Sequence, residues 1–262
     1  MADPRHSGAA ASLRRTRLIA RHTLGEALHL RLTVLAGLAA GALIAVALWL
    51  RELNFGSAEL KFLADFGLGA IGFCGTLLAA LVTAQLFLGE LENGAAGCVL
   101  ARPVRRREYL WGKFAGIAGV LALFTAVLGL VLAAVLAWRG AQLGVPAVGL
   151  RVFACACALQ WLKLTLVSAL TLLVSSYAGS ALFAGCAGLL LTLIAHLRTF
   201  AGGGGLAWLR VWPNLALFDS ESLLAAGSPP GGAWLLQLGL YWAAYVLVLG
   251  VIASHVFKRR EL

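Results

Sequence analysis

Residues 90–113 read ELENGAAGCVLARPVRRREYLWGK, and this charged segment lies between two long apolar stretches. It holds five of the 21 lysine and arginine residues and three of the 11 aspartate and glutamate residues of a 262-residue chain. Elsewhere charge is scarce: only 12% of all residues are charged, whereas a soluble domain averages about 25%. With a mean hydropathy of +0.90, the chain is predicted to be a membrane protein that keeps this segment in water.

Apolar runs on both sides of the charged segment define the expected architecture. A helix of about 20 apolar residues is long enough to cross a hydrocarbon core of about 30 Å. Six such runs occur, at 33–50, 66–88, 114–137, 152–174, 181–197 and 234–257, the fifth being the shortest. The sequence therefore predicts an all-α polytopic membrane protein with six transmembrane helices. The first 32 residues contain six arginines and no continuous apolar core, so we expect no secretory signal peptide and a retained N-terminus.

The distribution of basic residues predicts the orientation. Fourteen of the 21 lie in segment 1–32, in the charged segment and in the tail 258–262, and six lie in the connections 51–65, 138–151 and 198–233. Because short cytoplasmic loops carry the excess of lysine and arginine, we place both termini and the charged segment in the cytoplasm. This topology accounts for the net charge of +10, so no nucleic-acid partner is expected.

Motifs for chemistry are missing from the sequence. Gly112 and Lys113 are followed by Phe114 and lack the upstream glycine of a P-loop, so no nucleotide site is expected. Ser180 and His196 would lie about 24 Å apart on one helix, too far for a serine protease pair. The five cysteines show no CxxC spacing and are interpreted as small apolar fillers. We expect no catalytic residue, no metal and no cofactor bound by this chain.

One motif in three parts, and two further stretches, resemble the ABC-2 type transporter permeases. Glu92-Asn-Gly94, Val99-Leu-Ala-Arg-Pro-Val104 and Arg107-Glu-Tyr-Leu-Trp-Gly-Lys113 are similar to the family's signature between its second and third helices. Leu13–Leu32 resembles its amphipathic N-terminal elbow helix, and Trp212-Pro-Asn-Leu-Ala-Leu-Phe218 resembles its proline-asparagine segment between the last two helices. The likeness includes the subgroup that contains the permease for nitrous-oxide reductase maturation.

The resemblance implies an N-terminal segment 1–32 with the elbow helix, a six-helix permease domain 33–257 and a basic cytoplasmic tail 258–262. It implies that segment 89–107 is a cytoplasmic coupling helix, which docks on a separate ABC ATPase subunit that uses the ATP. The residues assigned to coupling and docking are Glu90, Glu92, Gly94, Gly97, Arg102, Pro103, Arg107, Glu108, Tyr109 and Lys113. A second copy or a related permease would complete the path.

The function implied is the permease subunit of an ABC exporter in a bacterial cytoplasmic (inner) membrane, without enzymatic activity of its own. Two alternatives remain open: a membrane anchor or sensor that does not transport, and a membrane enzyme of lipid metabolism. The arginines beside the spans are by themselves explained by a positive-inside anchor. Leu13–Leu32 has the helical spacing of apolar and basic residues that suits a helix lying against anionic lipid, and a loosely ordered basic tail is the alternative.

Lys163 lies in the middle of the fourth expected span, with no acidic residue inside any span to pair with it. A charge at that depth costs at least about 2.5 kcal/mol, so its side of the helix should face protein or a wet path. Polar residues share one arc of this helix and are assigned to a possible translocation path: Gln160, Lys163, Ser168, Thr171 and Ser175. Three explanations remain open: Lys163 meets an anionic group such as a lipid phosphate there, it snorkels, or the true boundaries of the span are shifted.

The outer connection 198–233 contains the proline-asparagine segment, with Trp212, Pro213 and Asn214 as its marker residues. Within it, Leu206–Ala226 combines aromatic residues with arginine, aspartate and glutamate, which suits short interfacial or re-entrant helices. An ordinary outer loop is the alternative.

Overall fold

The computed structural model describes residues 4–50, 59–92, 105–144, 149–198, 212–220, 223–224 and 230–259. Over these residues the chain forms helices and no strands. The helices are α1 (Pro4–His29), α2 (Arg31–Leu50), α3 (Glu59–Glu92), α5 (Arg106–Leu143), α6 (Leu150–Ser175), α7 (Ala181–Leu197), the short 3-10 helix η5 (Leu215–Phe218) and α9 (Gly232–Lys258). Helices α2, α3, α5, α6 and α9 are long and apolar enough to cross a membrane, and α7 is a shorter apolar helix. The prediction of an all-α fold is confirmed, and five of the six expected spans lie in helices long enough to cross a membrane, with α7 as the shorter sixth.

Two of the helices are much longer than the apolar runs that predicted them. The second and third expected spans have 23 and 24 residues, but α3 has 34 residues and α5 has 38. At about 1.5 Å per residue, α5 is about 57 Å long, well beyond a hydrocarbon core of about 30 Å. Hydropathy marks the part of a helix that suits lipid, whereas backbone hydrogen bonding continues into its polar ends. The connections expected at 51–65 and 138–151 are therefore partly helical. Their charges meet there, since Arg139 Nη2 lies 2.6 Å from Glu59 Oε1.

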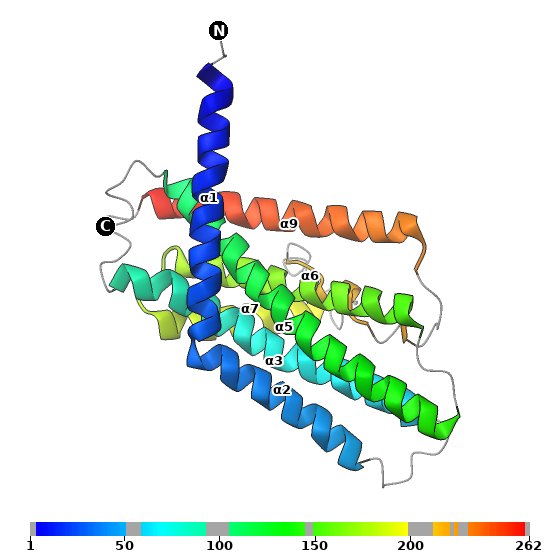
Figure 1. Ribbon diagram of the computed structural model, residues 1–262. Helices are drawn as coiled ribbons and strands as arrows, with labels where there is room; N and C mark the ends of the chain where they lie inside the picture. Colours follow the sequence, from blue (N-terminus) through cyan, green and yellow to red (C-terminus); the bar gives the residue numbers. More distant parts are fainter. Residues whose placement is uncertain are drawn as a thin grey trace.

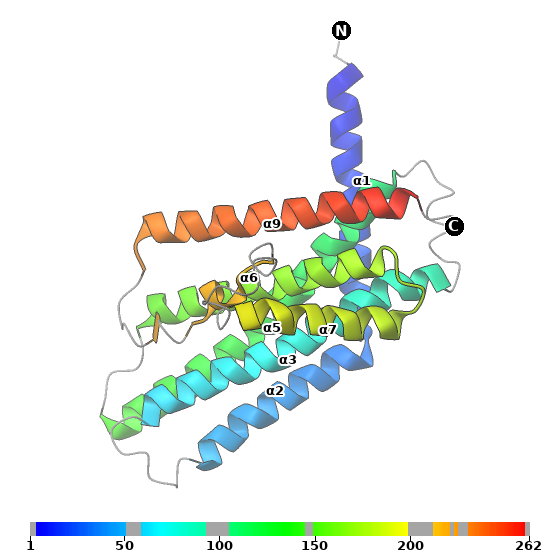
Figure 2. The ribbon, with the colours of Figure 1, turned by 180° about the vertical axis from the view of Figure 1, so that it is seen from behind.

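Helix α1 crosses the ends of the other helices instead of running beside them (Figures 1 and 2). It includes most of the expected elbow, Leu13–Leu32, but begins earlier and ends at His29. The chain turns at Leu30, where the hydroxyl group of Thr33 donates to the carbonyl oxygen of Ala27 at 2.6 Å. The end of α3, the start of α5 and the end of α9 lie beside α1, so four chain segments meet at one end of the bundle.

Glycines of α5 allow α1 to approach closely. A Cβ atom added at Gly112 would lie 2.8 Å from Cβ of Ile19, and one added at Gly116 would lie 2.7 Å from the carbonyl oxygen of Ala20. The two glycines are four residues apart and share one helix face, as in the small-residue contacts of membrane helices. Gly112, which the sequence excludes from a P-loop, therefore serves a close helix contact.

The chain after α7 folds back into the bundle, although the sequence places it in an outer connection. Leu215 and Phe218 of η5 are completely buried. Their neighbour Asn214 accepts a hydrogen bond from the backbone N–H of Ala216, and its own N–H donates to the hydroxyl oxygen of Tyr241 at 2.8 Å. Irregular backbone at membrane depth is tolerated where protein satisfies its polar groups. Residues 212–220, which include the short helix η5, therefore fit the prediction of short interfacial or re-entrant helices better than that of an ordinary outer loop.

Candidate functional site

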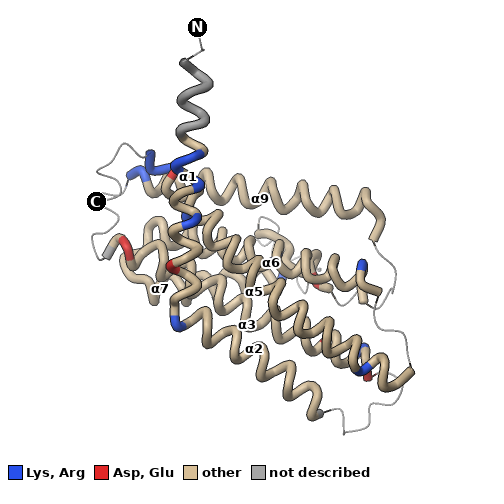
Figure 3. Tube along the Cα trace, viewed as in Figure 1, with Lys and Arg blue, Asp and Glu red and all other residues tan. Residues whose placement is uncertain are grey.

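Charged residues gather where α1 crosses the bundle (Figure 3). Five of them and one tyrosine form two neighbouring hydrogen-bonded groups, together called the charge cluster: Arg15 of α1 with Glu108 of α5, and Glu26 of α1 and Glu90 of α3 with Tyr109 and Lys113 of α5. Because the three helices are far apart in sequence, the charge cluster joins segments that neither periodicity nor hydropathy relates.

Lys113 lies at the centre of the charge cluster and is 1% exposed. Its ammonium group donates to Oε1 of Glu90 and, at 3.5 Å, to Oε2 of Glu26. The hydroxyl group of Tyr109 donates to the other oxygen of Glu90 at 2.6 Å. Both carboxylate oxygens of Glu90 are thus satisfied from α5. Removing one partner of such a buried pair leaves an uncompensated charge and typically costs about 3–5 kcal/mol.

Glu108 connects the start of α5 to α1. It accepts from Nε of Arg15 at 3.0 Å and from Nη2 at 3.1 Å, a bidentate geometry that strengthens charge-assisted hydrogen bonds. It also accepts from the backbone N–H of Arg105 at 3.3 Å. Glutamate at this third helical position supplies one half of a capping box. The same side chain therefore fixes where α5 begins and holds α1 against it.

Arg106 connects the start of α5 to the end of α9. Its guanidinium group donates to the carbonyl oxygens of Phe257 at 3.0 Å and Lys258 at 3.1 Å. Carbonyl groups at a helix C-terminus lack partners within the helix and carry partial negative charge, so an arginine is well placed there. The Phe257 ring stacks on that of Tyr109, with centroids 6.2 Å apart. Helices α1, α3, α5 and α9 thus form one connected unit at this end.

The structure places the predicted docking residues in two groups. Glu90, Glu108, Tyr109 and Lys113 bond to side chains within this chain, as described above, and Arg107 is exposed. The others lie outside the described residues: Gly94, Gly97, Arg102, Pro103 and the side chain of Glu92. Segment 89–107 begins within α3 and ends within α5, so its acidic start belongs to the last turn of a long helix and not to a separate short one. The docking role itself stays a prediction.

His22, Glu26 and Glu90 bring three potential metal-ligand atoms within 4.8 Å of one another. The ammonium group of Lys113, however, already bonds to both carboxylates. This ammonium group supplies the positive charge that a metal ion would bring. The closeness of His22, Glu26 and Glu90 is therefore not evidence for a metal site.

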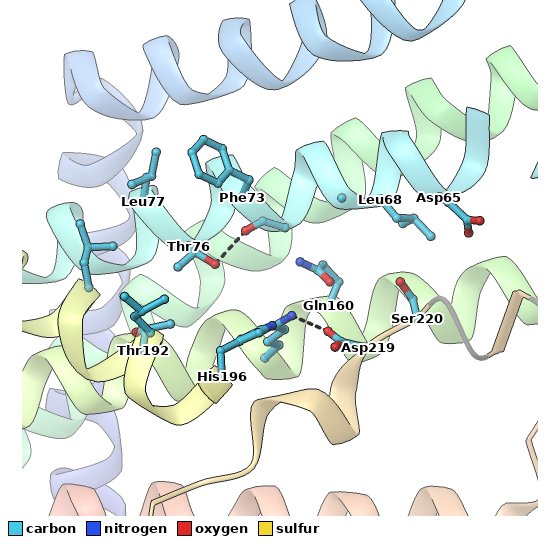
Figure 4. Close-up of a pocket in the computed structure, with 15 residues that line it drawn as sticks. Asp65, Leu68, Phe73, Thr76, Leu77, Gln160, Thr192, His196, Asp219 and Ser220 are labelled. Carbon is cyan, nitrogen blue, oxygen red and sulfur yellow. Dashed lines mark hydrogen bonds and ion pairs between the residues drawn. The ribbon is translucent and has the colours of Figure 1, made fainter. Parts of the chain in front are cut away.

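A cavity of about 430 Å³ lies within the bundle, lined by α3, α6, α7 and the residues just after η5 (Figure 4). Its polar lining comes from all four elements: Asp65, Thr76, Gln160, Lys163, Thr192, His196, Asp219 and Ser220. Leucines and Phe73 complete the wall. Asp65 and Asp219 were not assigned to a site from the sequence, and His196 was considered only in the excluded serine-protease pair. The one available signal was for Asp219, which directly follows the proline-asparagine segment.

Lys163 is paired, which corrects the expectation of a lysine without an acidic partner. Its ammonium nitrogen lies 2.6 Å from Oδ1 of Asp219. The sequence did not show this pair because hydropathy assigns Asp219 to the outer connection, whereas the backbone after α7 returns to the level of Lys163. Neither snorkelling nor a shifted span is needed to explain this lysine, since its partner reaches it.

The five residues assigned to a translocation path do not lie together in one open channel. Gln160 and Lys163 line the cavity. Ser168, Thr171 and Ser175 are completely buried, and their hydroxyl groups donate to backbone carbonyl oxygens of the preceding turn of α6. Thr171 packs against α7, since a Cβ atom added at Gly188 would lie 2.3 Å from its hydroxyl oxygen. These three residues serve helix contacts in this structure.

The family model that matches the chain is described as ABC-2 family transporter protein, and the match covers residues 16–206. The chain belongs to the ABC-2 transporter family. As a member, it is a multi-pass membrane permease of an ABC transporter, a transport subunit and not a catalytic one, of a kind that normally works with an ATPase subunit. No curated protein matches the chain.

The ABC-2 match covers the charge cluster except Arg15, as well as the charged segment and the cavity residues up to His196. It ends before Trp212, so the proline-asparagine segment lies outside it. The match does not distinguish the subgroup suggested by the sequence.

Proposed function

We propose that this ABC-2 permease exports its substrate across a bacterial cytoplasmic membrane, paired with a second copy of itself or a related permease. A separate cytoplasmic ATPase docks on segment 89–107 and supplies the energy of ATP hydrolysis. The family match supports the permease role, and the sequence, which has no P-loop, is consistent with a nucleotide site on another subunit.

The connectivity of the charge cluster is the observation that carries the coupling proposal. Residues 93–104 connect the end of α3 to the start of α5, and Glu90 of α3 bonds to Lys113 of α5. The same cluster holds α1, and Arg106 holds α9. A force applied to the connection would therefore move four helices together and not one loop.

Docking and anchoring make different predictions for the middle of the segment. Replacing Gly94 and Gly97 by leucine adds bulk where a short helix would approach a groove, and Glu92→Lys reverses a charge. Neither change lowers the inside positive charge, so the positive-inside rule predicts an unchanged topology. We expect these variants to insert normally, to lose the co-purifying ATPase in detergent and to lose the stimulation of ATP hydrolysis in proteoliposomes.

The matched control is the double variant Gly231→Leu and Gly232→Leu, in which both glycines are exposed at the opposite end of the bundle and have open space around them. This control should retain the ATPase. If the Gly94 and Gly97 variant also bound and stimulated the ATPase like the parent protein, the segment would be an anchor only.

A further inference from the structure

The cavity contains a buried hydrogen-bond donor that the described part of the chain does not use. Gln160 is 4% exposed, and its amide nitrogen Nε2 has no hydrogen-bond partner among the described residues. In Figure 4 its amide group points from α6 toward α3, into the space that the cavity occupies. Buried amide groups nearly always have a partner because an unpaired donor is costly. A ligand that offers an oxygen acceptor would complete this site.

The amide group of Gln160 packs closely against a glycine of the facing helix, where no larger residue would fit. A Cβ atom added at Gly72 of α3 would lie 2.5 Å from Nε2 of Gln160. Gln160 and Lys163 are three residues apart and share one face of α6. A head group that reaches the amide therefore also lies near the Lys163–Asp219 ion pair.

The charges of the lining favour a head group without net charge. Lys163 and Asp219 neutralise each other at 2.6 Å, so this pair beside Gln160 needs no counter-ion, and the remaining carboxylate, Asp65, lies apart from Gln160 nearer the start of α3 (Figure 4). An anion would meet the carboxylates of Asp65 and Asp219, and a cation would meet Lys163. A hydroxyl group can both accept from the amide of Gln160 and donate to a carboxylate or to His196.

The remaining wall suits an apolar chain. Leu68 and Phe73 of α3 face the cavity from one side, and Leu189 and Leu193 of α7 from another. A volume of about 430 Å³ falls in the usual range for small-molecule sites, roughly 300–1,000 Å³.

We propose that this cavity binds a neutral amphiphile with a hydroxylated head, in which a head oxygen accepts from Nε2 of Gln160 and an alkyl chain contacts the leucine wall. The idea that this amphiphile is also the transported substrate rests on the proposed function. The idea that it binds in the cavity does not depend on that function.

The test uses the purified full chain in phosphatidylcholine nanodiscs, without an ATPase. The probe is an alkyl glucoside with a diazirine in its chain, and peptide mapping locates the photochemical label. Octyl glucoside, octyl phosphate and octyltrimethylammonium compete at equal concentrations. We expect labelling in α3, α6 or α7 beside the cavity and the strongest competition from octyl glucoside. Stronger competition by the phosphate or the ammonium compound would overturn the neutral head, and no competition would show a cavity that holds only water.

Variants test whether Gln160 makes the contact. Gln160→Leu removes the donor and should reduce labelling about fivefold, the loss expected for one hydrogen bond to a ligand. Gln85→Leu is the matched control because Gln85 is exposed on α3 and does not line the cavity. Since Gln160→Leu removes an unpaired buried group, its unfolding temperature should equal or exceed that of the parent. Equal labelling of the Gln160→Leu and parent proteins would refute the contact.

The two proposals can fail separately. If octyl glucoside binds in the cavity but never stimulates the partner's ATP hydrolysis, the ligand class stands and the transport role is lost. If an ATPase couples to the permease but the cavity takes no glucoside, the permease role stands and the ligand class is wrong.

Discussion

The ammonium nitrogen of Lys163 lies 2.6 Å from Oδ1 of Asp219, although 56 residues separate the two and Asp219 lies outside every apolar run of the sequence. This pair fastens the backbone after η5 to the middle of α6. It forms part of the cavity wall, and the Asp219 side chain is 39% exposed there. The pair is therefore both an internal contact of the fold and a surface that a ligand would meet.

Exchanging the charges of this pair should restore part of the coupled ATP hydrolysis and of the stability that a single substitution removes. Lys163→Leu should insert normally and impair transport-coupled ATP hydrolysis, because Asp219 loses the cation that holds η5 in place. Since Asp219 is partly exposed, the loss of unfolding free energy should be modest, about 1 kcal/mol. The double variant Lys163→Asp with Asp219→Lys should recover part of both quantities in proteoliposome and thermal-unfolding assays. Full coupled activity in an inserted Lys163→Leu protein would exclude a functional role for the pair.

Lys113→Met should destabilise the protein far more than a change at an exposed lysine. The substitution leaves Glu90 and Glu26 without the buried ammonium group, at an expected cost of about 3 kcal/mol. Lys61→Met is the control, because Lys61 is exposed on α3. Thermal unfolding in nanodiscs measures both variants, and similar losses would show that the charge cluster contributes little. Adding Glu90→Leu to Lys113→Met should recover stability, since no uncompensated carboxylate of Glu90 then remains.

Gly116→Leu should loosen α1 from the bundle. Even a Cβ atom at this position would overlap the backbone of Ala20, and a leucine would force α1 away, at about 1–3 kcal/mol for overpacking. Hydrogen exchange of the backbone amides in α1 should rise, while exchange in α6 should not change. Gly239→Leu, on α9 with open space around it, should leave α1 as protected as in the parent. Unchanged protection of α1 in Gly116→Leu would contradict the close crossing.

The predicted topology can be tested with single cysteines in a protein whose five native cysteines are replaced. Cysteines at Ser57 and Ser228 should react with a membrane-impermeant maleimide in intact cells, because fourteen of the 21 basic residues lie on the other side. A cysteine at Ser12 should react only after the membrane is opened. The reverse pattern would invert the topology.

The transmembrane helices could be predicted because an apolar run of about 20 residues is long enough to cross the hydrocarbon core of a membrane as a helix. All six expected spans fall within observed helices, but the ends of α3 and α5 were missed. Glu59 and Arg139 lie in those ends and bond to each other. Hydropathy averaged along the sequence counts each of them as a polar residue and does not show that they pair.

The candidate site was predictable only in part. Lys163 and Gln160 stand out because polar side chains are rare in an apolar run, and both do line the cavity. Their surroundings depend on how distant segments pack, so neither Asp219 nor the pairing of Arg15 with Glu108 follows from local sequence. Ser168, Thr171 and Ser175 belong to the same polar arc, but their hydroxyl groups bond to carbonyl oxygens of their own helix, so a polar arc does not by itself indicate a wet face.

The crossing of α1 over α5 also sets an order of assembly. Arg15 is synthesised 93 residues before Glu108, its partner on α5. At about 5–20 residues per second, the ribosome needs roughly 5–20 s to make that stretch. During this interval the basic first helix has none of its partners on α5, and anionic lipid headgroups are the available substitute. Membranes poor in anionic lipid should therefore slow the maturation of this protein, even if they leave the finished molecule as stable as before.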